Sequence, residues 1–219
     1  MKNAFRFGAI ALFLTASSPA FAAIQIFNAP GVVQPAENVL LPSGQTGTTV
    51  MGMTNQSATS VTFKSNNGDV LTTPSNGQAR IETTENPSSL AALQFYLTNP
   101  SLNFTQFEFN LANIVGNGLQ LVTLNYAGSS SGSSTFSLGN GSNWLAGNAT
   151  DGSYFTNISF AASGAGTNDI RQIRIGGISA TAAVPEPATW MLMFMGLAFI
   201  GTVMRRKQAA QPGARVSFA

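Results

Sequence analysis

The chain has 219 residues, no cysteine and no histidine, and only 8% of its residues are charged. The absence of cysteine excludes a disulfide framework and a thiolate nucleophile, and the absence of histidine removes the commonest general base and zinc ligand. The whole-chain net charge of +2 comes from basic residues at the two ends. Residues 23–183 carry four basic and seven acidic side chains, a net charge of −3, so no basic patch remains to bind nucleic acid.

The first 22 residues have the three parts of a secretory signal peptide. Lys2 and Arg6 form a positive start, residues 7–16 are apolar, and small residues stand at Ala20 and Ala22. The apolar run is too short to span a bilayer core of about 30 Å, which argues against a permanent anchor. The order of these parts predicts an N-terminal signal helix that signal peptidase removes after Ala22.

Residues 23–183 show the alternation that is typical of strands, with no sustained helical period. Phe107, Phe109 and Leu111 alternate with Glu108 and Asn110, which places the two polar side chains on a solvent face. Asn-Gly and Asp-Gly turns separate several other short apolar runs. The pattern predicts a mainly β domain, an antiparallel β-sandwich or jelly roll of about eight strands with aromatic side chains between two sheets.

No catalytic constellation stands out in this domain. Asp69, Asp151 and Asp169 each adjoin Asn or Gly in turn-like sequence, where a carboxylate commonly caps its own backbone. Residues 169–178, which Asp169 begins, resemble the final strand that often precedes a sorting tail. Glu82 and Glu85 belong to no motif, although a glycosidase would need only two suitably spaced carboxylates. The serines have neither a histidine base nor a Gly-x-Ser-x-Gly elbow. We therefore expect no enzyme activity and no cofactor.

Two short segments are candidates for ligand binding. Residues 148–151 offer oxygen atoms to a calcium ion but lack the spaced acidic ligands of a calcium loop, so we predict a turn and no metal site. Trp144 and Tyr154, with Phe155 beside them, are the candidate glycan contacts. The alternative for Trp144 is a place in the core, because large aromatic side chains are usually mostly buried.

The C-terminal region joins a rigid acidic motif, an apolar run and a basic stop. Pro185-Glu186-Pro187 is non-helical, because each proline fixes its own φ and biases the residue before it toward extended geometry. Residues 188–204 carry no charge, and as a helix they would be about 25 Å long against a bilayer core of about 30 Å. This predicts a marginal transmembrane helix with Trp190 at its outer interface. The basic stop on the cytoplasmic side consists of Arg205, Arg206 and Lys207.

This arrangement resembles the PEP-CTERM sorting signal in its PEP-x-x-W form. The resemblance rests on residues 184–190 and the basic stop, after which the chain continues for twelve residues, 208–219. It implies that exosortase, a transpeptidase-like cysteine enzyme of the membrane, recognises the Pro-Glu-Pro motif and removes the helix. It also implies a Gram-negative bacterium that makes exopolysaccharide. An ordinary single-pass anchor that is kept remains the alternative.

Four parts follow from these patterns: a signal peptide at 1–22, an extracytoplasmic β-sandwich at 23–183, a sorting signal at 184–207 and a disordered cytoplasmic tail at 208–219. We expect a transient inner-membrane stage and then release to the outer surface or extracellular matrix. The predicted function is a non-catalytic structural component associated with exopolysaccharide or biofilm. The alternative is a secreted carbohydrate-binding, lectin-like module or a hydrolase. The expected partners are signal peptidase, exosortase, the inner membrane and exopolysaccharide.

Overall fold

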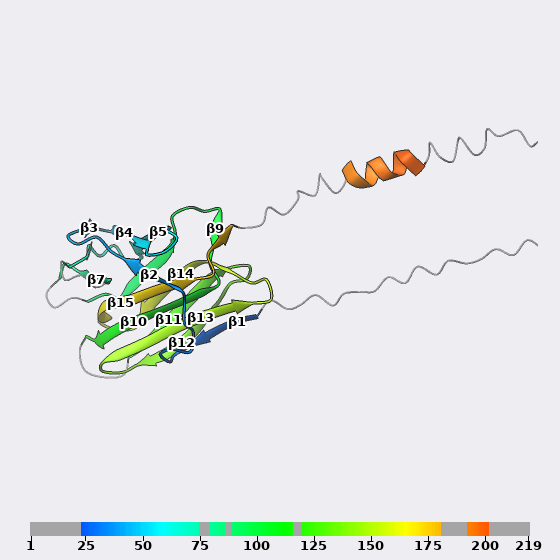
Figure 1. Cartoon of the computed structure of the whole chain (residues 1–219). Helices are drawn as coiled ribbons and strands as arrows, with labels where there is room; N and C mark the ends of the chain where they lie inside the picture. The colour runs from blue at the N-terminus through cyan, green and yellow to red at the C-terminus, as the bar shows by residue number, and fades with distance from the viewer. Residues whose placement is uncertain (1–22, 75–78, 86–88, 116–119, 181–191, 202–219) are drawn as a thin grey trace, which may run out of the picture. The chain divides into compact units, whose positions relative to one another are not determined.

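The computed structural model describes residues 23–74, 79–85, 89–115, 120–180 and 192–201. The chain divides into two units, Met1–Ala180 and Thr181–Ala219. The described part of the first unit is built of antiparallel strands (Figure 1). These strands are β1 (Ala23–Phe27), β2 (Glu37–Leu40), β3 (Thr46–Gly47), β4 (Thr49–Thr54), β5 (Ser60–Ser65), β6 (Leu71–Thr72), β7 (Arg80–Thr83), β8 (Ala92–Leu97), β9 (Leu102–Asn103), β10 (Gln106–Ile114), β11 (Gln120–Gly128), β12 (Gly132–Leu138), β13 (Ser142–Thr150), β14 (Phe155–Ala162), β15 (Thr167–Gly176) and β16 (Ser179–Ala180).

Fourteen of these strands form one continuous sheet that folds over at β2. The strand order is β1-β13-β10-β15-β2-β4-β5-β8-β14-β11-β12, with β7, β6 and β3 branching from β15, while β9 and β16 pair separately. Within β2, Glu37 and Asn38 pair with β15, whereas Val39 and Leu40 pair with β4. The sheet therefore has two layers, here named after their central strands: the β10 layer (β1, β13, β10, β15, β7) and the β8 layer (β4, β5, β8, β14, β11, β12).

Aromatic side chains fill the space between the two layers. The ring of Phe95 on β8 lies 6.2 Å from that of Phe107 and 5.7 Å from that of Phe109, both on β10. All three side chains are fully buried. Gly147 on β13 pairs with Phe107, and its lack of a side chain leaves room for the ring, since a Cβ there would collide with it. Edge and offset ring contacts of this kind add to the stability that burial alone supplies.

The prediction of a mainly antiparallel β domain with an aromatic interior is confirmed. The expectation of about eight strands in two separate sheets, as in a simple sandwich or jelly roll, is corrected by the continuous sheet of fourteen strands. The alternation of apolar and polar residues did not predict two features of the sheet. Strands of two residues, such as β3 and β6, are too short to show alternation, and the exchange of partners within β2 depends on segments distant in sequence.

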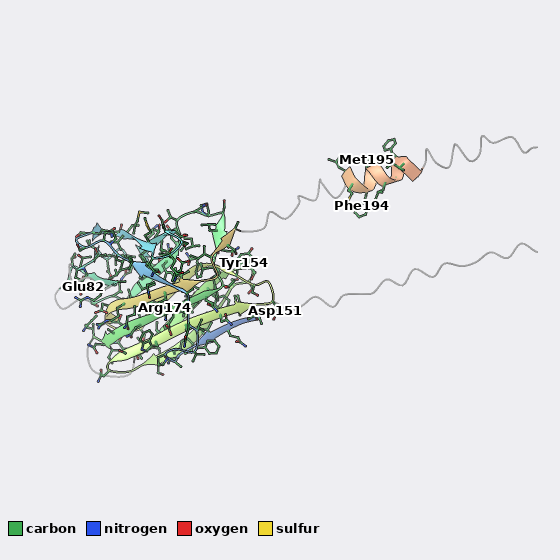
Figure 2. All side chains as sticks on the ribbon, viewed as in Figure 1. Glu82, Asp151, Tyr154, Arg174, Phe194 and Met195 are labelled. Atoms are coloured by element: carbon green, nitrogen blue, oxygen red, sulfur yellow. The ribbon has the colours of Figure 1, made fainter. Side chains whose placement is uncertain are left out.

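In the second unit, the described residues form one helix, 192–201. Each of its large apolar side chains is exposed over half or more of its surface, as Phe194 and Met195 illustrate (Figure 2). In the described parts of the chain, no helix has the length and apolar character that a membrane span needs. The predicted signal helix at 1–22 and the remainder of the predicted transmembrane helix lie outside the described residues.

Candidate functional site

The outer face of the β10 layer carries a buried carboxylate where a solvent-exposed one was predicted. Glu108 is 3% exposed, because residues 28–36, the crossing segment between β1 and β2, cover it. The backbone N–H of Gly31 donates a hydrogen bond of 2.9 Å to Glu108 Oε1, and Arg174 Nη1 lies 3.8 Å from Oε2. The alternation placed Glu108 on the correct face of the strand, but nothing local showed that a distant segment would cover that face.

Residues 169–178 were predicted to form a strand, which β15 confirms over most of that range, but the expectation that Asp169 caps a turn is wrong. It lies within β15, 3% exposed, where Arg171 donates from Nε and Nη2 to its two carboxylate oxygens at 2.7 and 2.6 Å. This hydrogen bonding raises the pKa of the Arg171 guanidinium. Arg80 Nε on β7 lies 3.9 Å from the same carboxylate. The pair is therefore a fixed structural contact, and the strand pairing of β15 overrides the turn character of the Asn-Asp dipeptide.

Glu37, at the start of β2, is a third buried carboxylate, and no sequence motif predicted its burial. Ser57 donates from its backbone N–H at 2.7 Å and from its hydroxyl at 2.8 Å to Oε2, and Gln56 donates from its backbone N–H at 3.3 Å. Burial acts to raise the pKa of the Glu37 carboxyl, but the hydrogen bonds from Ser57, Thr54 and Gln56 outweigh it and lower the pKa. The carboxylate thereby holds the β4–β5 turn against β2.

The two candidate glycan contacts, Trp144 and Tyr154, do not form one platform. Trp144 is half-buried on the outer face of the β10 layer, opposite Asn110. Tyr154 lies beyond the far end of β13, and the six residue steps from Trp144 to Thr150 alone span about 20 Å of strand. Phe155 is fully buried in the core and unavailable to a sugar.

The turn between β13 and β14 agrees with the interpretation that preferred a turn to a calcium loop. Asp151 has a φ of 54° and Gly152 a φ of 80°, and Asp151 accepts a hydrogen bond from the neighbouring Thr150 hydroxyl at 3.2 Å. Figure 2 shows Asp151 and Tyr154 at the same end of the domain, with Glu82 at the other. Over the residues that the structure describes, no cluster of three acidic, histidine or cysteine side chains is placed to hold a metal ion.

Two shallow hollows flank residues 98–102, which follow β8, and no sequence pattern indicated them. The first, of about 410 Å³, has Gln94 and Tyr96 of β8 and Asn157 of β14 in its lining, and Asn157 pairs directly with Tyr96. The second, of about 470 Å³, lies on the other side of the loop, and the two share Thr98 and Leu102. No charged residue lines either hollow, so their chemistry suits a neutral, hydroxyl-rich ligand better than an ion.

Comparison with protein families adds a finding for the C-terminal region. A model described as the PEP-CTERM protein-sorting motif matches residues 183–207. The chain carries a PEP-CTERM sorting domain. The match contains the predicted Pro-Glu-Pro motif and the basic stop, and it identifies an exported, cell-surface protein of the kind that exosortase sorts. The curated proteins and the solved structures contain no match to the chain.

The predicted processing residues of this PEP-CTERM protein lie outside the described residues. Those of the sorting motif are Pro185, Glu186, Pro187 and Trp190, those of the signal-peptidase site are Ala20 and Ala22, and those of the membrane stop are Arg205, Arg206 and Lys207. Their predicted roles depend on the order of residues along the chain. The β domain contributes the hollows and the buried carboxylates, which depend on contacts between distant segments.

Proposed function

We propose that the exported domain of this PEP-CTERM protein is a non-catalytic structural component of the cell surface or extracellular matrix, associated with exopolysaccharide. The observation that carries the proposal is that the buried carboxylates are all bound by other groups of the domain. Glu108 and Asp169 face arginines, and Glu37 accepts hydrogen bonds from a turn. A glycosidase needs one carboxylate free to donate a proton and another free to act as nucleophile or base. Carboxylates held in this way instead support a structural role.

The sorting route that we propose has two cleavages. Signal peptidase cuts after Ala22, and the basic stop holds the C-terminal helix in the inner membrane until exosortase cuts at Pro185-Glu186-Pro187. The released protein then starts at Ala23 with the first residue of β1. The route predicts a mature protein that consists of the β domain and a short C-terminal remnant.

Mass spectrometry of the protein collected outside the producing cells tests this route. We expect an N-terminus at Ala23 and a C-terminus at the Pro-Glu-Pro motif, with residues 190–204 missing. Glu186→Gln should leave the chain in the membrane fraction, while Gln211→Ala, beyond the basic stop, should be released like the wild type. Released protein that still carries residues 190–204 would contradict exosortase cleavage and favour the retained anchor.

A carbohydrate-binding module is the second candidate, and the hollow that Tyr96 lines favours it. The amides of Gln94 and Asn157 can donate and accept hydrogen bonds, as sugar hydroxyls require, and Tyr96 adds a ring and a phenol group. Glycan-array binding that is lost in Tyr96→Ala and kept in Trp144→Ala would support this site. Loss in Trp144→Ala alone would move the site to the β10 layer. Shortened glycans recovered from the array would support the hydrolase alternative and contradict a non-catalytic role.

A further inference from the structure

The two ends of the folded sheet leave an open seam. β1 pairs with β13 and β12 pairs with β11, and in the described part of the chain neither strand has a partner on its other side. Starting from β2, the β10 layer ends at β1 and the β8 layer ends at β12, so both free edges lie opposite the fold at β2 (Figure 1). A free edge presents a row of unpaired N–H and C=O groups that can pair with another strand.

The strands along this seam lack the usual protection of an edge. Residues 23–36 and 109–150, which include β1, β13, β11 and β12, contain no Asp, Glu, Lys or Arg. Neither β1 nor β12 contains proline. Natural edge strands commonly carry lysine, proline or an inward-pointing charge that prevents pairing with another chain. If the signal peptide is removed after Ala22, the α-amino group of Ala23 is the one charge added, and it lies at the end of β1.

Apolar side chains at the seam are only partly covered. Ile24 and Ile26 on β1 and Phe136 on β12 pack against the core but stay partly exposed. Tyr126, on the adjacent β11, does the same. A strand added at either edge would cover these side chains, and burial of apolar surface is the main favourable term in protein association. The seam therefore offers both hydrogen-bonding groups and apolar surface to a partner.

We propose that the seam is a docking surface for a second copy of this chain, with β1 of each copy pairing with β12 of the other. Each copy supplies both edges on the same side, so a twofold axis parallel to the strands lets one partner satisfy both. The β10 layer of one copy then continues into the β8 layer of the other. The acidic net charge of the domain resides elsewhere, so the uncharged seams meet without repulsion. The pairing does not depend on how the C-terminal region is processed.

A pair of lysine substitutions on β12 tests the proposal. Ser134 pairs with the fully buried Leu124 and is partly covered, whereas Ser133 is exposed on the outer face. In a single copy the Ser134→Lys ammonium can reach water through the open seam, but in the dimer it is trapped between layers. We expect a concentration-dependent dimer for the wild type by size-exclusion chromatography with light scattering. Ser134→Lys should weaken dimerisation about tenfold or more, and Ser133→Lys by less than about twofold.

A cross-linking experiment keeps the test independent of how well these variants fold. The chain has no native cysteine, so Gln25→Cys on β1 and Ser133→Cys on β12 each introduce a single thiol. Mixing the two full-length variants under mild oxidation should give a covalent heterodimer, and replacing one partner with Met53→Cys, at an exposed position on β4, should not. A wild-type protein that stays monomeric at every concentration overturns the proposal. So does equal cross-linking in both mixtures, or an equal effect of the two lysine substitutions.

Discussion

Two regions of the β domain differ in their content of charged side chains. Around β15, carboxylates lie under the crossing segment or between strands, and each meets an arginine or a backbone N–H: Glu108 with Arg174 and Gly31, and Asp169 with Arg171. Along the seam strands β1, β13, β11 and β12 there is no charged side chain, and burial alone holds the layers together. The first region stays stable because its charges have partners, and the second because it has no charges.

The comparison shows how a domain with few charges distributes them. A buried carboxylate without a partner strongly destabilises a fold, so the charged residues gather where arginines and backbone donors converge. The uncharged half keeps a uniform apolar interior but leaves its edges open. We therefore expect the β15 region to be sensitive to the loss of a charge and the seam region to be sensitive to its gain.

The largest expected effect is the introduction of a charge into the seam region. Val122 on β11 is fully buried, so Val122→Asp should lower the free energy of unfolding by about 4 kcal/mol or more, because the carboxylate has no cation nearby. Thr123→Asp, on the outer face of the same strand, should change it by less than about 1 kcal/mol. Urea denaturation monitored by circular dichroism measures both. Similar losses of unfolding free energy in the two variants would show that a charge destabilises this strand whether or not it is buried.

The next effect is the removal of a charge from the β15 region. Asp169→Ala leaves Arg171 without its bidentate partner, and we expect a loss of about 2–3 kcal/mol in the free energy of unfolding. The loss stays below that of Val122→Asp because the Arg171 side chain is 32% exposed and can turn to water. Glu85→Ala, at an exposed position, is the control and should be within about 0.5 kcal/mol of the wild type. A negligible effect of Asp169→Ala would mean that the Asp169–Arg171 pair does not stabilise the domain.

Glu37 should give a smaller, pH-dependent effect. Its folded-state pKa lies below the ordinary value for a glutamate carboxyl, so its contribution is complete above that ordinary value and is lost as the pH falls through the folded-state pKa. At pH 7, Glu37→Gln should destabilise the domain by about 1–2 kcal/mol, because hydrogen bonds to a charged acceptor are lost. Thermal melts of both proteins across this pH range should converge at acidic pH. A constant difference at every pH would mean that the charge of Glu37 contributes nothing.

The smallest expected effect is at an ion pair near the surface. Arg80 Nη2 lies 2.8 Å from Glu82 Oε2, with the two side chains 34% and 24% exposed. Glu82→Gln should therefore cost less than about 1 kcal/mol, and added salt should reduce the difference from the wild type. Urea titrations at low and high ionic strength measure it. A loss as large as that of Asp169→Ala would place Glu82 within the same buried network.

Local alternation was reliable for the interior and unreliable for the surface. Phe107, Phe109 and Leu111 face the core as their spacing predicted. Glu108 alternates with them as predicted, yet it is buried, because exposure depends on what covers the outer face of a strand. Asp151 lies in the predicted turn, while Asp169, in similar local sequence, lies in a central strand. The sequence predicted a strand over residues 169–178, but the Asn-Asp dipeptide did not show that Asp169 is buried within it, since strand pairing with β10 and β7 decides that.

The sequence by itself determined the sorting domain and the β character of the remainder. Residues 183–207 could be identified without a structure, because the motif, the apolar run and the basic stop act through their order along the chain. Only the tertiary structure decided that one sheet folds over at β2, that Glu37, Glu108 and Asp169 are buried, and that the edges of β1 and β12 stay open. Each of these features arises where residues far apart in sequence meet, and the two-residue alternation of a strand does not show which distant segments will pack against it.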